Sequence, residues 1–215
     1  PLSLGNRVWI DEGAIAATPG VDLTQFNDGV MNGTEAGIAN VVLNLYYDAN
    51  GNGIYDAIID GVDEADIYRT TTTDASGYYL FDGLPEGVFY VEVDSANFNT
   101  GNALDGYQSS EDQPAFNDEA TDLNDNGEDD IAYLTNGIRS REFDLDYDAE
   151  PISETDLPAN TAANQTAYGP NLRGRYGEED ASSNLTFDFG FVKTHSIGNR
   201  VWRDSDNSGT INALD

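Results

Sequence analysis

Residues 70–93 have the sequence TTTTDASGYYLFDGLPEGVFYVEV, in which apolar runs alternate with turn residues. Two segments with turn composition, residues 74–77 and 82–87, flank the run Tyr78-Tyr79-Leu80-Phe81. The run that follows places three apolar residues on one face with a period of two: Phe89, Val91 and Val93. This pattern is typical of half-buried strands. The stretch therefore predicts a meander of short antiparallel strands.

The same period of two occurs on both sides of this stretch. Before it, four residues alternate toward one face: Val41, Leu43, Leu45 and Tyr47. Near the C-terminus four more alternate, with Thr186 and Asp188 opposite them: Leu185, Phe187, Phe189 and Phe191. No long segment has a convincing helical period, and 12 Tyr and 9 Phe can supply a core. We therefore predict an all-β fold, an antiparallel β-sandwich.

A short motif near the N-terminus recurs near the C-terminus. Leu4-Gly5-Asn6-Arg7-Val8-Trp9 is matched by Ile197-Gly198-Asn199-Arg200-Val201-Trp202, an offset of 193 residues from position 4 to position 197. Recurrence of a motif that contains a rare Trp indicates a repeat. We predict a tandem array with this period or a head-to-tail assembly, in which the partners are neighbouring copies of the same unit.

The recurrence also suggests the domain boundaries. We expect one repeat unit over residues 1–195 and the beginning of the next unit over residues 196–215. Residues 12–26 are predicted to be an insertion, because the second copy of the motif continues directly into an acidic loop. Residues 97–184 are polar and rich in Asp, Asn, Gly and Ala, so we expect a second insertion there that forms an elaborated loop and not a second core.

The charge balance is strongly acidic, with 40 Asp and Glu against 9 Lys and Arg and a formal net charge of −31. Nucleic acid is excluded as a partner, because its phosphates would be repelled. Repulsion of this size destabilises a compact chain unless bound metal or concentrated salt offsets it, and both explanations stay open. The absence of cysteine excludes disulfides and zinc-thiolate sites.

Four acidic loops have the spacing of calcium ligands. Ca²⁺ takes about 6 to 8 oxygen ligands, so a loop that binds it needs carboxylates and amides at alternate positions and Gly at a sharp turn. The strongest match is the terminal loop, with ligands expected from Asp204, Asp206, Ser208, the Thr210 carbonyl and Asp215. The second comprises Asp48, Asn50, Asn52, the Ile54 carbonyl and Asp56, with Asp60 as a candidate closing carboxylate. The third comprises Asp122, Asn124, Asn126, the Glu128 carbonyl and Asp130. The fourth, divided by the first insertion, comprises Asp11, Asn27, Asn32 and Glu35, with Asp28 beside them.

Any single run of Asp, Asn and Gly is equally compatible with an ordinary solvated turn. Three runs in one register favour metal binding, with several Ca²⁺ ions per chain. Magnesium is a weaker candidate, because it demands tighter octahedral geometry. Extracellular modules bind calcium with dissociation constants on the order of 10⁻⁴ to 10⁻³ M, which suits a secreted protein.

Several motifs together resemble the SdrD B-like, or Cna B-type, repeat family of bacterial surface proteins. They are Gly37-Ile38-Ala39-Asn40-Val41-Val42-Leu43, the stretch from Thr70 to Gly87, the opening Gly-Asn-Arg-Val-Trp, and Asn184-Leu185-Thr186-Phe187-Asp188-Phe189-Gly190-Phe191. They frame residues 4 to 192. The resemblance implies a prealbumin-like or inverse immunoglobulin-like β-sandwich that occurs in tandem, binds calcium and acts as a stiff spacer at the cell surface.

This sequence departs from the family in two respects. Its two insertions exceed the usual repeat length, and its only Lys, Lys193, lies at the far end of the unit. Some Cna B-type domains contain a Lys-Asn isopeptide bond with the Lys in an early strand. We therefore predict no such bond here, and we expect calcium to stiffen the unit instead.

The predicted function is a calcium-stabilised structural repeat of a secreted surface stalk or extracellular filament. The alternative is an adhesin or carbohydrate-binding module, for a host or glycan ligand, that uses exposed aromatic rings: Tyr107, Phe116, Tyr168 and Tyr176. Catalysis is not expected, because the only histidine, His195, lies in the predicted linker and no carboxylate pair stands out. No stretch approaches the about 18 to 20 apolar residues that span a bilayer, so we expect no transmembrane segment.

Overall fold

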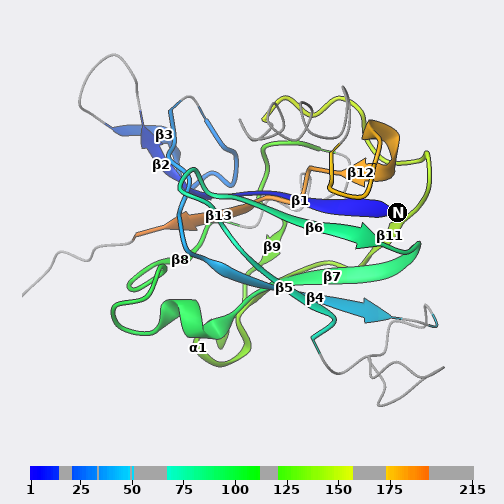
Figure 1. The fold of residues 1–215 in the computed structure, drawn as a ribbon. Coiled ribbons are helices and arrows are strands. Elements are labelled where there is room, and N and C mark those ends of the chain that lie inside the picture. Colours follow the sequence, from blue (N-terminus) through cyan, green and yellow to red (C-terminus); the bar gives the residue numbers. More distant parts are fainter. Residues whose placement is uncertain are drawn as a thin grey trace, which may run out of the picture.

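The computed structural model describes residues 1–14, 21–32, 34–48, 50, 67–111, 121–156 and 173–193, and its strands form two main sheets and a separate hairpin (Figure 1). The strands are β1 (Leu2–Ile10), β2 (Glu12–Ala14), β3 (Val21–Phe26), β4 (Val42–Asp48), β5 (Arg69–Thr72), β6 (Tyr78–Leu84), β7 (Gly87–Val93), β8 (Gln108–Ser109), β9 (Gly127–Glu128), β10 (Ile138–Ser140), β11 (Phe143–Leu145), β12 (Ser183–Asn184) and β13 (Phe189–Val192). The short helices are η1 (Ser95–Phe98), α1 (Tyr133–Asn136) and η2 (Asp180–Ser182).

β1 is the central strand of the first sheet. It pairs antiparallel with β6 along one edge, and the other edge pairs parallel first with β12 and then with β13. β8 pairs with the end of β13 and forms an edge of this sheet. Because β1 and β13 are parallel, the start of β1 and the end of β13 lie at opposite ends of the sandwich (Figure 1).

The second sheet has the order β5-β4-β7-β10-β9, and all of its pairings are antiparallel. β10 pairs with the last residues of β7, while β11 pairs with its first residues, so the two short strands share one edge of β7. The two main sheets, and the short helices of the described ranges, confirm the predicted all-β sandwich.

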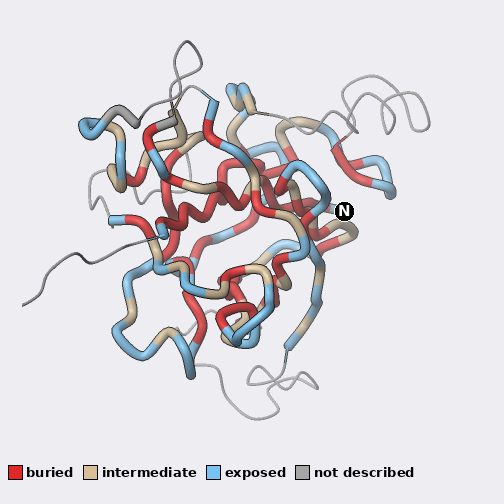
Figure 2. The backbone as a smooth tube through the Cα atoms, turned by 90° about the vertical axis from the view of Figure 1, so that its left-hand side faces the viewer, coloured by how far each residue is buried: buried red, intermediate tan, exposed pale blue. Residues whose placement is uncertain are grey.

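The core lies between the two sheets, and the predicted alternation selects its residues. Val41, Leu43 and Leu45 are fully buried, and so are Phe89, Val91 and Val93. Burying a side chain of this size contributes about 1.5 to 3 kcal/mol relative to leaving it exposed. Figure 2 shows buried backbone through the middle of the molecule and exposed backbone in the peripheral loops.

The predicted meander is wrong in its pairing. β6 and β7 are consecutive, but β6 pairs with β1 in the first sheet and β7 pairs with β4 in the second. The connecting turn therefore crosses between the sheets instead of closing a hairpin. Gly83 and Gly87 begin and end this crossing with φ of +68° and +141°, values that a side chain would strain.

The two predicted insertions differ in structure. Residues 12–26 contain the separate hairpin of β2 and β3 beyond the end of β1. The region 97–184, which we expected to be a loop, supplies β8 to β12, and five of its buried residues pack into the same core: Phe98, Leu104, Ile138, Phe143 and Leu145. These strands have two or three residues each, which is too short for a period of two to be recognised in the sequence.

No helix within the described ranges is both long and apolar enough to cross a membrane.

Candidate metal centre

The divided fourth loop is brought together at the end of β1. Asp11 follows β1 directly and is fully buried, with its backbone N–H bound to the Phe191 carbonyl at 2.9 Å. Its carboxylate accepts hydrogen bonds from the backbone N–H groups of Asn27 and Gly29, both at 2.9 Å. The two parts of the loop that the insertion separates in sequence are therefore adjacent in space.

Glu35 closes the same loop from its other end. Its side chain is 5% exposed and accepts hydrogen bonds from the N–H groups of Gly13 at 2.8 Å and Asn32 at 2.7 Å. Asp28, between them, accepts from the N–H of Val30 and from the Asn32 side-chain amide. The predicted ligands of this loop thus lie together with Asp28, and we call Asp11 with residues 27–32 and 34–35 the first acidic loop.

Burial makes the first acidic loop electrostatically costly. Desolvation raises the pKa of Asp11 above its ordinary value. Desolvation raises the pKa of Glu35 to about 7, and the charges of Asp11 and Asp28 add to this rise. Among the described residues, none of these three carboxylates forms an ion pair with a basic side chain. A cation in the loop would relieve this repulsion.

The third predicted loop, residues 122–130, has the ligand spacing of the loop from Asp48, and its arrangement differs from that of the first acidic loop; we call it the second acidic loop. The Asp122 carboxylate accepts from the N–H and hydroxyl of Thr155, at 2.6 and 3.1 Å, and from the N–H of Asp156. The Asn6 side-chain amide on β1 also donates to it at 3.3 Å. Asp122 therefore joins β1 to the segment 155–156.

The remaining residues of the second acidic loop turn in different directions. Asn124 is buried and its side-chain atoms have no hydrogen-bond partner among the described residues, while the Asn126 side-chain oxygen accepts from the N–H of Asp188 at 2.8 Å. Glu128 pairs with Arg141 at the surface, 3.1 Å away. Asp130 is exposed and accepts from residues at the start and end of α1.

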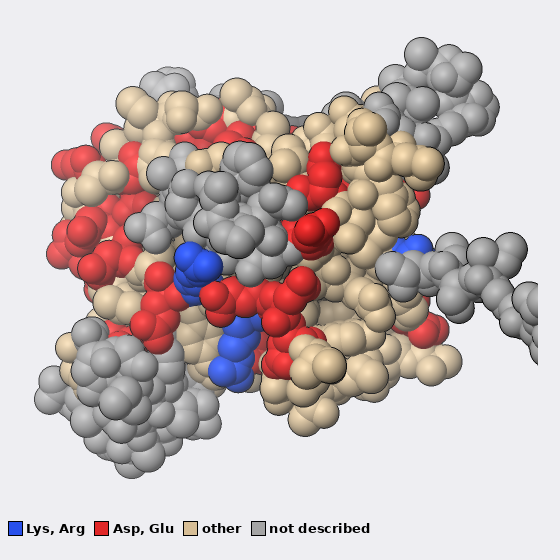
Figure 3. Space-filling model, turned by 180° about the vertical axis from the view of Figure 1, so that it is seen from behind, with Lys and Arg blue, Asp and Glu red and all other residues tan. Residues whose placement is uncertain are grey.

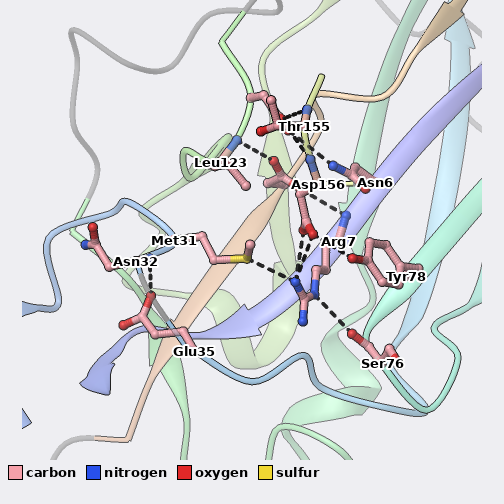
Figure 4. A network of polar contacts seen from close by, with 12 residues as sticks. Asn6, Arg7, Met31, Asn32, Glu35, Ser76, Tyr78, Leu123, Thr155 and Asp156 are labelled. Carbon is pink, nitrogen blue, oxygen red and sulfur yellow. Dashed lines mark hydrogen bonds and ion pairs between the residues drawn. The ribbon is translucent and has the colours of Figure 1, made fainter. Parts of the chain in front are cut away.

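Between the two loops lies a polar network that the sequence did not reveal (Figure 4). The Arg7 guanidinium contacts both carboxylate oxygens of Asp156, at 2.9 and 3.1 Å, and donates to the Ser76 carbonyl. The Tyr78 hydroxyl donates to the same carboxylate at 2.6 Å. A cavity of about 440 Å³ beside this network is lined by residues of both loops, among them Glu35 and Leu123. The recurrence of Arg7 in the repeated motif was the only sequence signal for this network.

Asp188 is a residue that the sequence pattern placed on the wrong face. The alternation put it on the outer face of a half-buried strand, but it is 1% exposed, and β13 begins only at Phe189. Its carboxylate accepts from the N–H groups of Arg7 and Leu123, both at 3.0 Å. Burial, followed by the nearby charge of Asp122, raises its pKa well above the ordinary value. Asp188 thus fastens the second acidic loop to β1.

The other two predicted loops fall largely outside the described residues. In the loop from 48 to 60, Asp48 is buried and accepts from the N–H of Asn50 at 3.1 Å. The other predicted ligands of that loop lie outside the described residues: Asn52, Ile54, Asp56 and Asp60. The same holds for the terminal loop with Asp204, Asp206, Ser208, Thr210 and Asp215.

Across the described ranges, no three acidic or histidine side chains converge into a set that could hold a metal ion by themselves. A calcium ion in the first acidic loop would therefore also need amide, backbone or water oxygens, which are ordinary calcium ligands. Calcium binding stays a prediction.

The aromatic rings considered for ligand binding are not gathered on one surface in the part of the chain that is described. Tyr107 packs against the core, with the Lys193 ammonium 5.0 Å from its ring centroid. Tyr176 is 62% exposed and lies over Gly83. Phe116 and Tyr168 lie outside the described residues.

The chain is similar to two serine-aspartate repeat proteins of staphylococci. It is 27% identical over 209 residues to serine-aspartate repeat-containing protein F of Staphylococcus epidermidis, covering 96% of this chain and 8% of that protein. It is 25% identical over 269 aligned residues to serine-aspartate repeat-containing protein D of Staphylococcus aureus, covering 96% of this chain and 18% of that protein.

A shorter match joins 42% of the chain to 2% of Colossin-B of Dictyostelium discoideum, at 30% identity over 90 residues. No family model matches the chain. The chain spans less than a fifth of the length of these relatives. Similarity to the serine-aspartate repeat proteins along nearly the whole chain confirms the resemblance to SdrD B-like repeats.

Proposed function

We propose that this SdrD B-like domain is a structural spacer unit of a bacterial cell-surface stalk or extracellular filament, and that calcium stabilises its acidic loops. The observation that carries the spacer role is the parallel pairing of β1 with β13. We call the end of the sandwich at Leu2 and Leu84 the proximal end, and the end at Ile10 and Val192 the distal end.

A chain that begins at the proximal end and leaves at the distal end extends an array with every unit it adds. If the two termini lay at the same end, successive units would fold back beside one another. The recurrence of the β1 motif 193 residues later supports the presence of a following unit. The relatives' name, serine-aspartate repeat-containing protein, fits a surface location and a structural or adhesin-related role, and we extend both to this chain by analogy.

The calcium part of the proposal rests on the first acidic loop. Buried carboxylates without a basic partner destabilise a fold unless a cation neutralises them. Asp11 and Glu35 are buried and have no basic partner among the described residues. The neighbouring carboxylate of Asp28 is partly exposed. Figure 3 shows that acidic side chains also cover much of one face and border its few basic groups, so cations would reduce repulsion there too.

A catalytic role is not part of the proposal. The arginine, tyrosine and carboxylate groups of the network around Arg7 bind one another, and the structural or adhesin-related role proposed from the relatives requires no reaction.

Thermal unfolding in a few millimolar calcium, in magnesium and in excess EDTA, with bound metal measured by mass spectrometry, tests the calcium proposal. We expect a calcium-selective rise in the unfolding temperature, because an ion present at a hundred times its dissociation constant stabilises the folded state by about 2.7 kcal/mol. An unchanged midpoint with no bound metal would refute calcium stabilisation and favour adaptation to salt. Electron microscopy of the native material tests the spacer role, which predicts extended chains of units.

A further inference from the structure

The exposed apolar side chains of the described residues concentrate at the two ends of the sandwich. At the distal end, Leu23 and Phe26 on β3 are 82% and 37% exposed, and β3 belongs to the hairpin beyond β1. In the same region, Ile131 is 102% exposed and Leu134 on α1 is 62% exposed. Four large apolar residues thus face solvent where the chain leaves the unit.

Three more are at the proximal end. Tyr176 lies over Gly83, next to the pair formed by Leu84 and Leu2, and is 62% exposed. Tyr147 is 47% exposed, and its N–H donates to Glu86 in the turn between β6 and β7. Ile67 is 47% exposed and directly precedes Tyr68. The backbone N–H of Tyr68 donates to the Leu45 carbonyl near the end of β4. Ile152, the eighth exposed residue of this kind, follows Glu150, whose backbone N–H donates to the Ala181 carbonyl.

The distal end also contains a groove of about 640 Å³. Its floor contains Ile138 and Val192, which are 1% and 2% exposed, and its walls include Ile131 and Tyr133. Glu111 and Asp130 contribute carboxylates to its lining. The groove lies between β8, at the edge of the first sheet, and the segment that joins β9 to β10 in the second. An apolar floor with an acidic rim suits a partner that presents aromatic and basic groups.

The chain itself sets how far away the next unit can begin. β13 ends at Val192, and the offset of 193 residues makes position 195 the counterpart of Leu2 at the start of β1. Three residues span at most about 11 Å when fully extended. A following unit that folds in the same way must therefore place its proximal end directly against the distal groove.

We propose that the distal groove of each unit is the docking surface for the proximal end of the next copy. The rings of Tyr147 and Tyr176 in the following unit would cover the apolar walls of the groove. Arg175 is 64% exposed beside Tyr176 and pairs with Asp82 at 2.7 Å, and its guanidinium would also face the acidic rim, which is opposite in charge. The contact is heterologous and does not close, so it propagates a straight or helical array. This inference rests on the proposed spacer function and specifies the interface between its units.

The test uses the complete 215-residue chain, extended by residues 36–193 so that a second unit is finished. This junction follows the sequence, because Asp215 aligns with Glu35 in the two copies of the acidic loop. The chain has no cysteine, so a single Ile131→Cys substitution can be placed in either unit and its alkylation rate measured. In the first unit the groove would be covered, whereas in the second unit it would be free. The second unit lacks residues 12–26, so Ile131→Cys in the 215-residue chain alone serves as a further control and gives the alkylation rate for an uncovered groove in the first unit.

We expect the thiol in the first unit to react about tenfold more slowly than the thiol in the second, because a contact that is closed nine-tenths of the time exposes it for the remainder. Tyr176→Cys should show the reverse, with slower reaction in the second unit. Thr70→Cys on β5, the exposed edge strand of the second sheet opposite β9, should react at the same rate in both units.

Equal rates for Ile131→Cys in the two units would overturn the docked contact. Small-angle X-ray scattering of the same protein separates this failure from failure of the proposed function. An elongated particle with equal rates would leave the spacer function standing and reject only the interface. A compact particle, with the units side by side, would overturn both.

Discussion

The first and second acidic loops were both predicted from Asp, Asn and Gly residues, yet the fold uses them differently. In the first loop, the carboxylates of Asp11 and Glu35 are buried in one another's field. In the second, Asp122 binds neighbouring N–H groups and Glu128 pairs with an arginine, so these two carboxylates have different partners. The comparison teaches that acidic and amide residues at ligand spacing do not by themselves decide whether the carboxylates converge.

The largest expected effect concerns the protonation of Glu35. Its pKa in the fold is about 7, against an ordinary value of 4.5, so the folded state holds the proton more tightly than the unfolded state. In EDTA, the stabilisation from this proton is fully present below pH 4.5 and is lost as the pH rises through 7, a change of about 3 kcal/mol in the free energy of unfolding.

Urea unfolding of the wild type and of Glu35→Gln at a series of pH values measures this effect. Relative to the wild type, the free energy of unfolding of Glu35→Gln should increase as the pH rises from 4.5 to 7. Saturating calcium should abolish or reverse the trend, because the ion stabilises the ionised carboxylate. A difference that does not depend on pH would remove the electrostatic distinction between the two loops.

The next effect is on calcium stabilisation itself. Asp28→Asn keeps the size of the side chain but removes its charge, so it should weaken the first loop's ion and reduce the stabilisation by calcium by up to about 2.7 kcal/mol, the contribution of one site at a hundred times its dissociation constant. Asp130→Asn in the second loop is the matched control and should leave the calcium response unchanged. Calorimetry with and without calcium measures both, and equal losses in the two variants would contradict the comparison.

Asp122→Ala should destabilise the protein without affecting calcium. It leaves the N–H groups of Thr155 and Asp156 without their acceptor, at a cost of about 2 kcal/mol, since water replaces the carboxylate at this partly exposed position. The loss should be equal in calcium and in EDTA, and Asp122→Asn should recover part of it. Native mass spectrometry that showed one fewer bound ion in Asp122→Ala would place a metal in the second loop.

The smallest effect is expected for Glu128→Gln. Its ion pair with Arg141 spans 3.1 Å, but both side chains are about half exposed. Such pairs contribute about 0 to 1 kcal/mol and are screened by salt. The unfolding midpoint should therefore hardly change in 0.15 M salt, and a large change would mean that Glu128 has a partner other than Arg141.

The buried faces of the longer strands could be predicted, because side chains of a strand alternate between its two faces. The alternation in the segments from Val41 and from Phe89 identified buried faces correctly, since one face of a strand must pack inward. β10 and β11 were missed because runs of three residues carry too little periodicity. The pairing of β6 with β1 was missed because a turn that crosses between sheets has the same composition as a hairpin turn.

By itself, the sequence determined the all-β class, the repeated motif, the buried faces of the longer strands and the positions of the acidic loops. These properties depend on residue type and spacing along the chain. Only the tertiary structure decided that Asp11 meets Glu35, that Asp188 is buried against β1 and that the start of β1 and the end of β13 lie at opposite ends of the unit. Those relations join residues far apart in the sequence, and what fixes them is the pairing of strands and the supply of backbone N–H groups at each carboxylate.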